Sequence, residues 1–531
     1  MRRFTTIILL SIFSLWCLHG LGVQAQAKDI NTLNVGWYHA RISTLDPHVQ
    51  NATERYICYM TCEPLIGRHR DTLKRIPKLA TSWEISPDAK VFTFHLRKGV
   101  KFHDGTVFDA DAVKFTFDRI SYLKKGFYWM LKWLEDVQVV DKYTIRFVLN
   151  ETFAPFISVV EYFPIVSPKS VLENEEVKGD YAKKWYIDHG VGTGPYRFVK
   201  WEHGVKVVHE KYDEYWGGWK GKHVNKVVHW LIPEAGTQRM MLEKGELDVI
   251  QTFTPDDFVA YKKGKHPEIT VAEKDSMAPM YIRLNCAAPP TNNVKVRQAL
   301  SYCFNRGLFA EMMPGGVQMS DGPCPKELLG GWRPENVIME YNPEKAKKLL
   351  AEAGYPNGFE MDVLVQKGTQ RTQTIAEIWQ TGLVKAGVKL NIRPLPWPAI
   401  ATQLHKWAVD RDPATATAAY VQWISPRLPD PYSYLYLAYH SDAQTGKGRN
   451  WMLYSNPQVD EMSEKAVKMV DEEERMKIYK KAVQIVANDC PDVFVEKVID
   501  QVILRKVVAN FYFDALYVKT VPYYDVYKTA P

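Results

Sequence analysis

The chain has 531 residues, too many for a single hydrophobic core, so two or three lobes are expected. Hydrophobic residues make up 46% and charged residues 24%, with no low-complexity run, heptad pattern or internal repeat, which argues against an extensively disordered or repetitive protein. The net charge of +7 is not gathered into Lys/Arg-rich clusters, so nucleic-acid binding is not expected.

The N-terminal segment has the three parts of a secretory signal peptide. Arg2 and Arg3 supply positive charge, an apolar run spans 7–18, and small residues end the segment at Ala27. The apolar run is shorter than the roughly 20 residues that a membrane-spanning helix needs. We therefore expect residues 1–27 to be removed on export, leaving a periplasmic or otherwise extracytoplasmic protein with a charge of 7 − 2 = +5.

Six cysteines remain after this cleavage, and their spacing leaves their pairing open. They are Cys58, Cys62, Cys286, Cys303, Cys324 and Cys490. No second closely spaced pair and no histidines accompany Cys58 and Cys62, so we expect no metal site. Lipid attachment at Cys17 is a minor alternative, because Trp16 precedes it where a small residue is required.

A short strand is predicted at 33–37, followed by the loop YHARISTLDP. Further along, Phe92, Phe94 and Leu96 alternate with polar residues, which is the period of a half-buried strand. The turn sequences KG and HDGT follow at 98–99 and 103–106, so the chain reverses twice within a few residues.

A helix is predicted immediately after these turns. Asp109 or Asp111 can accept hydrogen bonds from the free backbone amides of its first turn. Val113, Phe117 and Ile120 then lie along one face at spacings of four and three. The stretch 80–120 therefore combines a strand, a double turn and a capped helix.

Glycines and Pro195 precede an alternating strand near 192–204, a further strand is predicted at 227–232, and a helix over 237–244 ends at Gly245. Trp216 and Trp219 flank two glycines, and we interpret them as core and turn packing rather than as ligand-stacking residues.

The second half alternates helices with strands. Asn342 and Pro343 begin a helix that ends at Gly354. The other predicted elements are helices at 296–313, at 372–385 and at 457–488, and strands at 359–365 and 493–508. This alternation is typical of a largely parallel α/β sheet.

Catalytic motifs are missing from the sequence. It has no G-x-S-x-G elbow, H-E-x-x-H helix, Walker loop or G-x-G-x-x-G after a strand, and its 14 histidines are scattered. We therefore expect neither an enzyme nor a cofactor. Aromatic residues, at 13%, fall partly in loop-like polar segments, which suits a cleft that encloses a polar ligand.

From strand through double turn to helix cap, residues 80–120 resemble the signature region of the extracytoplasmic solute-binding proteins of family 5, which are peptide-, nickel- and oligosaccharide-binding subunits of ABC importers. The resemblance covers nearly the whole mature chain. It implies an α/β fold of the periplasmic binding protein type, in which two lobes with mixed sheets are joined by a hinge, with an extra subdomain in the first lobe. The expected boundaries are 28–275 for the first lobe with an insertion at about 60–195, 276–495 for the second lobe, and 496–531 for a return to the first.

The resemblance also implies a function. The two lobes would close on a small solute and present it to an ABC permease with its ATPase, the protein itself being a monomer. An extracytoplasmic enzyme on the same scaffold and a receptor-coupled sensor are the alternatives from other classes.

In peptide-binding relatives, a strand ending in Trp leads to an Asp that pairs with the ligand amine, and an Asp-Pro follows. The run QWISPRLPDPYSYL resembles this pattern at Trp423 and Asp430, but Pro426 and Arg427 stand where the amine-binding carboxylate is expected. Asp430 is either a ligand contact or a structural turn residue.

In dipeptide-binding relatives, an Arg before the helix at 372–385 receives the ligand carboxylate, and the similar position here is Lys367. With Arg427 and Arg41 in the loop at the cleft mouth, the resemblance implies a cleft that favours an anionic end: a short peptide or an opine-like or sugar-acid compound. The alternative is that Lys367 and Arg427 point to solvent. Tyr38, Trp397 and Trp423 would line the cleft. Stacking of a neutral oligosaccharide on Trp37, Trp397 and Trp423 is the close alternative, with a nickel chelate third.

Overall fold

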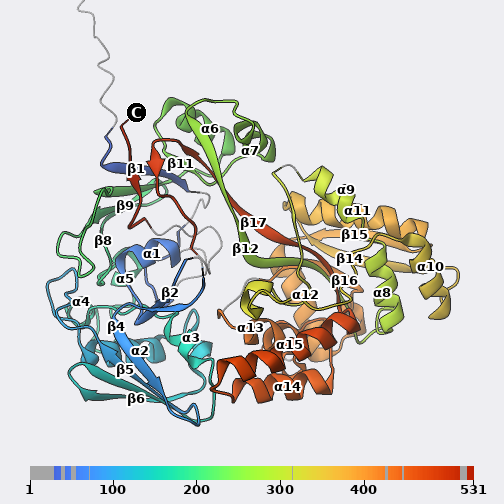
Figure 1. Ribbon diagram of the computed structural model, residues 1–531, viewed down its shortest axis with the longest axis horizontal. Coiled ribbons are helices and arrows are strands. Elements are labelled where there is room, and N and C mark those ends of the chain that lie inside the picture. The colour runs from blue at the N-terminus through green and yellow to red at the C-terminus, as the bar shows by residue number, and fades with distance from the viewer. Residues whose placement is uncertain are drawn as a thin grey trace, which may run out of the picture.

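The computed structural model describes residues 29–37, 42–49, 55–70, 72–313, 315–424, 428–444, 448–514 and 523–530. Figure 1 shows two lobes with a smaller sheet subdomain below the first, and two long strands, β12 (Ile269–Leu284) and β17 (Asp492–Arg505), that run from one lobe to the other. The mixed α/β architecture expected from the sequence is confirmed.

A single eleven-stranded sheet runs through both lobes in the order β15-β14-β16-β12-β17-β11-β1-β10-β9-β8, with β13 also paired to β17. Its first-lobe strands are β1 (Thr32–Trp37), β8 (Tyr196–Glu202), β9 (Lys206–Lys211), β10 (Lys226–Leu231) and β11 (Val249–Ile250). Its second-lobe strands are β13 (Gln318–Met319), β14 (Glu360–Gln366), β15 (Lys389–Leu395) and β16 (Ala419–Trp423).

The crossing strands are irregular between the lobes, where their register shifts twice, between Asp275 and Pro279 and again between Met280 and Tyr281. Their antiparallel register shifts between Asp275, opposite Ile499, and Pro279, opposite Lys497, so three residues face one. The Ser276 hydroxyl donates to the Val498 carbonyl at 2.6 Å and occupies a backbone acceptor at this bulge. The ladder is therefore continuous within each lobe and interrupted where they meet.

The smaller subdomain is a four-stranded antiparallel sheet in the order β4-β5-β7-β6. Its strands are β4 (Ala80–Ile85), β5 (Val91–Leu96), β6 (Leu134–Asp141) and β7 (Thr144–Leu149). The predicted strand, turns and cap are confirmed. Gly99 and Gly105 have positive φ, and the Asp109 carboxylate accepts from the Ala112 amide at 3.3 Å to begin α2 (Ala110–Leu123).

The remaining helices lie along the chain in both lobes. Those before the first crossing strand are α1 (Arg55–Thr61), η1 (Tyr128–Leu131), α3 (Phe156–Val160), α4 (Pro168–Leu172), α5 (Trp185–Asp188), α6 (Ala235–Lys244) and α7 (Pro255–Lys262). Those after it are α8 (Val294–Tyr302), α9 (Arg306–Met312), η2 (Lys326–Leu329), α10 (Pro343–Glu352), α11 (Gln370–Lys385), α12 (Trp397–Asp410), η3 (Pro413–Thr415), α13 (Tyr432–Tyr434), η4 (Leu435–Tyr439), η5 (Ser441–Gln444), α14 (Pro457–Val467) and α15 (Glu472–Asp489). None of the described helices is long and apolar enough to cross a membrane.

Two predicted helices are each divided in two. The stretch 457–488 breaks because the Asp471 carboxylate accepts from the Glu473 and Glu474 amides and begins a second helix, α15. Asn305 begins α9 in the same way, by accepting from the Leu308 amide. A polar cap inside a helical pattern can therefore end one helix and begin the next.

The C-terminal segment returns to the first lobe. Strands β18 (Val508–Ala509) and β19 (Tyr527–Lys528) pair with each other, as do β2 (Ile66–Arg68) and β3 (Arg75–Pro77). The Lys528 ammonium binds the Asp248 carboxylate at 3.0 Å and the Thr32 carbonyl at 2.9 Å. All six cysteines of the described residues carry free thiols.

The small subdomain also contacts the second lobe. Tyr432 packs edge-on against the stacked rings of Trp133 and Phe153, and the Ala154 amide donates to the Val467 carbonyl at 2.7 Å. These contacts join the subdomain to the helical end of the second lobe.

Candidate functional site

The carboxyl ends of strands from both lobes point toward the region where the lobes meet. In the second lobe, β14 is parallel to both β15 and β16, and Trp423 at the end of β16 pairs with Met280, next to the bulge. In the first lobe, β1 is parallel to β10 and β11, and β11 approaches the same bulge along β17. Ligands of open α/β sheets bind outside such carboxyl ends.

Three predicted site residues lie together at the second-lobe edge. Lys367 follows β14, Trp397 follows β15, and Trp423 ends β16. Lys367 is exposed, and its backbone amide is fixed by the Leu395 carbonyl at 2.9 Å. Trp423 is 42% exposed, which is unusual for a tryptophan at the end of an otherwise buried strand.

Trp397 is more enclosed than the other two residues at this edge. Its ring centroid lies 6.2 Å from that of Trp451, and it packs against a small cluster that includes Ile400 and Leu404. Part of this ring therefore contributes to the core beneath the edge.

Tyr38 and Arg41 follow β1 directly, and Arg427 follows Trp423 by four positions. All three lie outside the described residues. Their predicted roles rest on their sequence positions next to the two edges.

The first-lobe edge also carries polar groups that the sequence reasoning missed. Gln251 follows β11 and is 2% exposed, yet neither its amide nitrogen nor its amide oxygen has a hydrogen-bond partner among the described residues. The hydroxyl of Thr252 also has no hydrogen-bond partner among the described residues. Buried polar atoms normally have partners, so these groups are available to a ligand or to water. The signal in the sequence was a polar pair directly after a short buried strand.

A buried ion pair fixes the loop that follows β1. The Arg119 guanidinium on α2 donates to both Asp46 oxygens, at 2.9 and 2.7 Å, and to His48 Nδ1 at 2.8 Å. His48 Nε2 lies 2.9 Å from the Pro164 carbonyl, which is the arrangement of a neutral imidazole protonated on Nε2. Burial opposes ionisation of Asp46, but the guanidinium outweighs it, and the pKa of Asp46 lies below its usual value.

A second ion pair lies in the part of β17 that belongs to the second lobe. The guanidinium of Arg371, in the first turn of α11, binds both oxygens of Glu496. Burial raises the pKa of Glu496, and Arg371 opposes that shift. On the next residue, the buried Lys497 ammonium binds Asp321 at 2.7 Å and Glu327 at 2.8 Å. Charged groups therefore fix the crossing strand beside the edge that carries Lys367.

Asp430 has the contacts of a structural turn residue. It is 4% exposed, accepts from the Tyr432 amide at 2.9 Å and lies 3.6 Å from the Arg475 guanidinium. Trp216 and Trp219 have structural contacts too, since their indole N–H groups donate to Glu63 at 2.6 Å and to the Tyr212 carbonyl at 2.8 Å.

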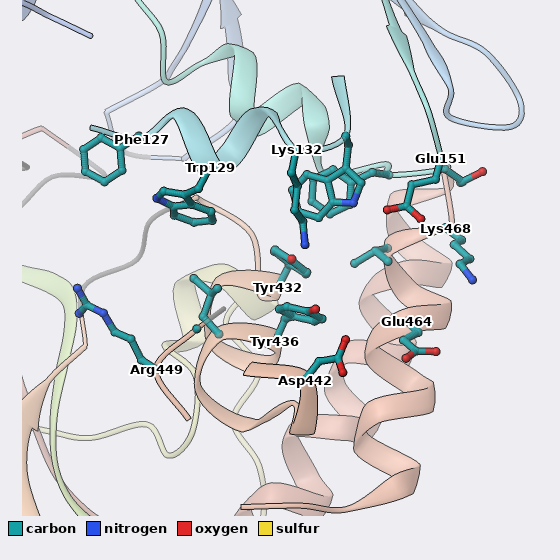
Figure 2. Close-up of a pocket in the computed structure, with 16 residues that line it drawn as sticks. Phe127, Trp129, Lys132, Glu151, Tyr432, Tyr436, Asp442, Arg449, Glu464 and Lys468 are labelled. Carbon is teal, nitrogen blue, oxygen red and sulfur yellow. The ribbon is translucent and has the colours of Figure 1, made fainter. Parts of the chain in front are cut away.

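A cavity of about 930 Å³ lies between the small subdomain and the second lobe (Figure 2). Tyr432, two residues after Asp430, is part of its lining. Phe127, Trp129 and Lys132 reach it from the subdomain, while Tyr432 and Tyr436 reach it from the second lobe. Both lobes thus contribute side chains to one hollow. Among the described residues, no group of three or more His, Cys, Asp and Glu side chains is arranged to hold a metal ion.

Two lobes joined by continuous strands, with the carboxyl ends of their parallel strands directed at the junction, define a two-lobed solute-binding protein. Residues 74–446 match the family described as "Bacterial extracellular solute-binding proteins, family 5 Middle". The chain belongs to this family, which confirms the expected binding-protein class and extracellular family.

Individual relatives match most of the chain. It is 32% identical to heme-binding protein A of Haemophilus influenzae over 78% of this chain and 77% of that protein. It is 29% identical to the glutathione-binding protein GsiB of Pectobacterium atrosepticum over 85% and 86%. The structure of the ABC transporter-associated periplasmic binding protein DppA from Helicobacter pylori, in complex with the peptide STSA, matches with a TM-score of 0.73 and 27% identity, covering 94% of this chain and 97% of that one.

Proposed function

We propose that this protein is the extracytoplasmic solute-binding subunit of an ABC importer, and that it captures a short peptide or a similar small anionic solute between its lobes. The observation that carries the proposal is the exposed Lys367 side chain at the carboxyl edge of the second lobe, together with the Gln251 amide at the carboxyl edge of the first lobe, which has no partner among the described residues. A carboxylate-ended ligand would bind the ammonium and accept a hydrogen bond from the amide nitrogen. The relatives named for glutathione and for a peptide support this class of ligand.

The remaining predicted residues complete the proposed site. Tyr38 and Arg41 would close it from the first lobe, and Trp397, Trp423 and Arg427 from the second, while Asp430 would shape the turn behind them. The protein would act as a monomer without catalysing a reaction, and would pass its solute to a permease and its ATPase. Its lobes would be 28–275 and 276–495, with residues 1–27 removed on export.

Calorimetric titration with a set of short peptides and a set of neutral oligosaccharides tests the ligand class. We expect a peptide to bind, and Lys367→Ala to weaken its affinity by about tenfold or more, because a charge-assisted hydrogen bond contributes about 1.5–3 kcal/mol. Arg427→Ala is expected to weaken it similarly.

Lys389→Ala is the matched control. Lys389 is an exposed lysine at the amino end of β15, whereas Lys367 follows the carboxyl end of the neighbouring strand β14. It is expected to leave the affinity unchanged. Tight binding of a neutral sugar, insensitive to Lys367→Ala and Arg427→Ala, would show that the proposed ligand class is wrong. Recovery of the peptide chemically intact after incubation checks that binding occurs without turnover.

Small-angle X-ray scattering tests the proposed movement of the lobes. A ligand that contacts both lobes stabilises their closed arrangement, so we expect the radius of gyration to fall when a binding peptide is added. The interrupted ladder at 275–279 is where we expect the strands to bend. Identical scattering curves with and without saturating peptide would contradict this.

A further inference from the structure

The cavity in Figure 2 is not explained by the two strand edges of the proposed site. It lies between the small subdomain and the helical end of the second lobe, and its volume of about 930 Å³ is in the range of small-molecule sites. The Tyr434 hydroxyl, two residues after the lining residue Tyr432, donates to the Met277 carbonyl in the bulge beside which Trp423 pairs with Met280. The cavity therefore lies near the bulge at the junction of the lobes and is lined by residues of both.

Aromatic rings make up much of its wall. They are Phe127, Trp129, Trp133, Phe153, Tyr432 and Tyr436. Several are fixed by one another: Trp133 and Phe153 are stacked with centroids 3.5 Å apart, and Tyr432 and Tyr436 are stacked at 5.0 Å. Trp129 is 38% exposed and Tyr436 is half-buried, so these two rings remain accessible.

The charges around these rings balance. Three cations (Lys132, Lys468 and Arg449) and three carboxylates (Glu151, Asp442 and Glu464) line the cavity. The Lys132 ammonium lies 4.1 Å from the centroid of Trp133 and 5.3 Å from that of Tyr436, so it bridges rings of the two lobes. Burial, with Asp442, Glu464 and Glu151 nearby, raises the pKa of Tyr436 to about 12, which keeps its phenol neutral. A balanced charge selects neither an anion nor a cation, which leaves the accessible rings of Trp129 and Tyr436 to discriminate between ligands.

We infer that this cavity is a side-chain pocket for an aromatic residue of the bound solute, an inference that rests on the proposed peptide-binding function. An aromatic side chain would place its ring against the accessible rings of Trp129 and Tyr436 in stacked or edge-on arrangements. It would contact the small subdomain and the second lobe together, and would therefore favour their association. An aliphatic side chain would fill the same volume without the ring contacts.

Titration with five tripeptides tests the pocket: Ala-Ala-Ala, the three peptides that carry one Phe at each position, and one peptide with Leu at the best Phe position. We expect one Phe peptide to bind about tenfold or more tightly than Ala-Ala-Ala, and more tightly than its Leu counterpart. Trp129→Ala is expected to remove most of that gain and to leave the affinity for Ala-Ala-Ala unchanged.

Tyr122→Ala is the matched control, because Tyr122 is an exposed ring on α2 of the same subdomain, away from the cavity lining. This variant is expected to change neither the affinity for the Phe peptide nor the affinity for Ala-Ala-Ala. If all the peptides bind equally, or if Trp129→Ala weakens them all to the same degree, the pocket is overturned while the proposed function stands. If no tripeptide binds, the pocket and the proposal of a short-peptide solute both fail.

Discussion

Replacing Arg119 with methionine is expected to lower the free energy of unfolding by about 3–5 kcal/mol, because it leaves the Asp46 carboxylate buried without its counter-ion. Both side chains are completely buried, and the guanidinium binds both carboxylate oxygens. Methionine can fill much of the volume of the arginine stem, so most of the loss would come from the unpaired charge. Urea denaturation of the two proteins measures the difference directly.

The same replacement is also expected to weaken ligand binding. Asp46 and His48 end the loop that follows β1, and Arg119 fixes both of them to α2. Because Tyr38 and Arg41 belong to this loop in the sequence, its release would loosen the proposed first-lobe contacts. Titration at a temperature where the variant remains folded separates this effect from unfolding.

A matched control lies on the same helix. Lys114 forms an exposed pair with Asp118 at 3.3 Å, and Lys114→Met is expected to cost less than about 0.5 kcal/mol. The double variant Arg119→Met with Asp46→Leu should regain much of the lost stability, since it removes both charges together. If Arg119→Met costs no more than Lys114→Met, the buried pair does not have the energetic role assigned to it.

Elements with local signals could be predicted from the sequence. The Asp109 cap, the turns at Gly99 and Gly105, and the helix begun by Asn342 each depend on neighbours within a few residues, and the structure confirms all of them. Lys367 and Trp423 are named from the resemblance and Trp397 from its loop-like surroundings, and only the strand pairing shows that all three lie at the carboxyl ends of neighbouring parallel strands.

Contacts between distant segments could not be predicted in the same way. Asp46 and Arg119 are 73 positions apart, and Arg371 and Glu496 are 125 apart, so neither pair has a local signature. The cavity likewise combines rings near 127–153 with rings at 432 and 436. Residue type shows that such groups need partners when buried, but only the fold determines which partners they obtain.

Acidification from pH 7 to pH 5 is expected to lower the stability of the protein by several kcal/mol through its buried histidines. Burial lowers the pKa of His48 and of His103 to about 4 and that of His229 to about 3, and it lowers the pKa of His209 well below its usual value. His209 and His229 lie on β9 and β10 with ring centroids 6.2 Å apart, so protonation of one also disfavours protonation of the other.

The direction of this change in stability follows from how many protons the folded and the unfolded chain bind. Below pH 6.5 the unfolded chain binds a proton at each of these histidines, whereas the folded chain does not until the pH approaches 4 or lower. Their contribution is therefore fully present above pH 6.5 and is lost as the pH falls toward the folded pKa values. The loss at pH 5 is about 2 kcal/mol for each of His48, His103 and His229. Urea unfolding at half-unit pH steps measures the slope.

Removing one of these groups should flatten the slope. His229→Gln lacks the titrating ring, so we expect the fall in stability between pH 6 and pH 4.5 to become shallower by about 1.4 kcal/mol per pH unit. The variant loses the 3.3 Å contact of His229 with the Tyr523 hydroxyl and is expected to be less stable at pH 7, so the test compares slopes rather than absolute stabilities. His405→Gln changes an exposed histidine on α12 and should leave the slope as it is. Parallel pH profiles for the parent protein and His229→Gln would mean that this imidazole is protonated in the folded protein as readily as in the unfolded chain.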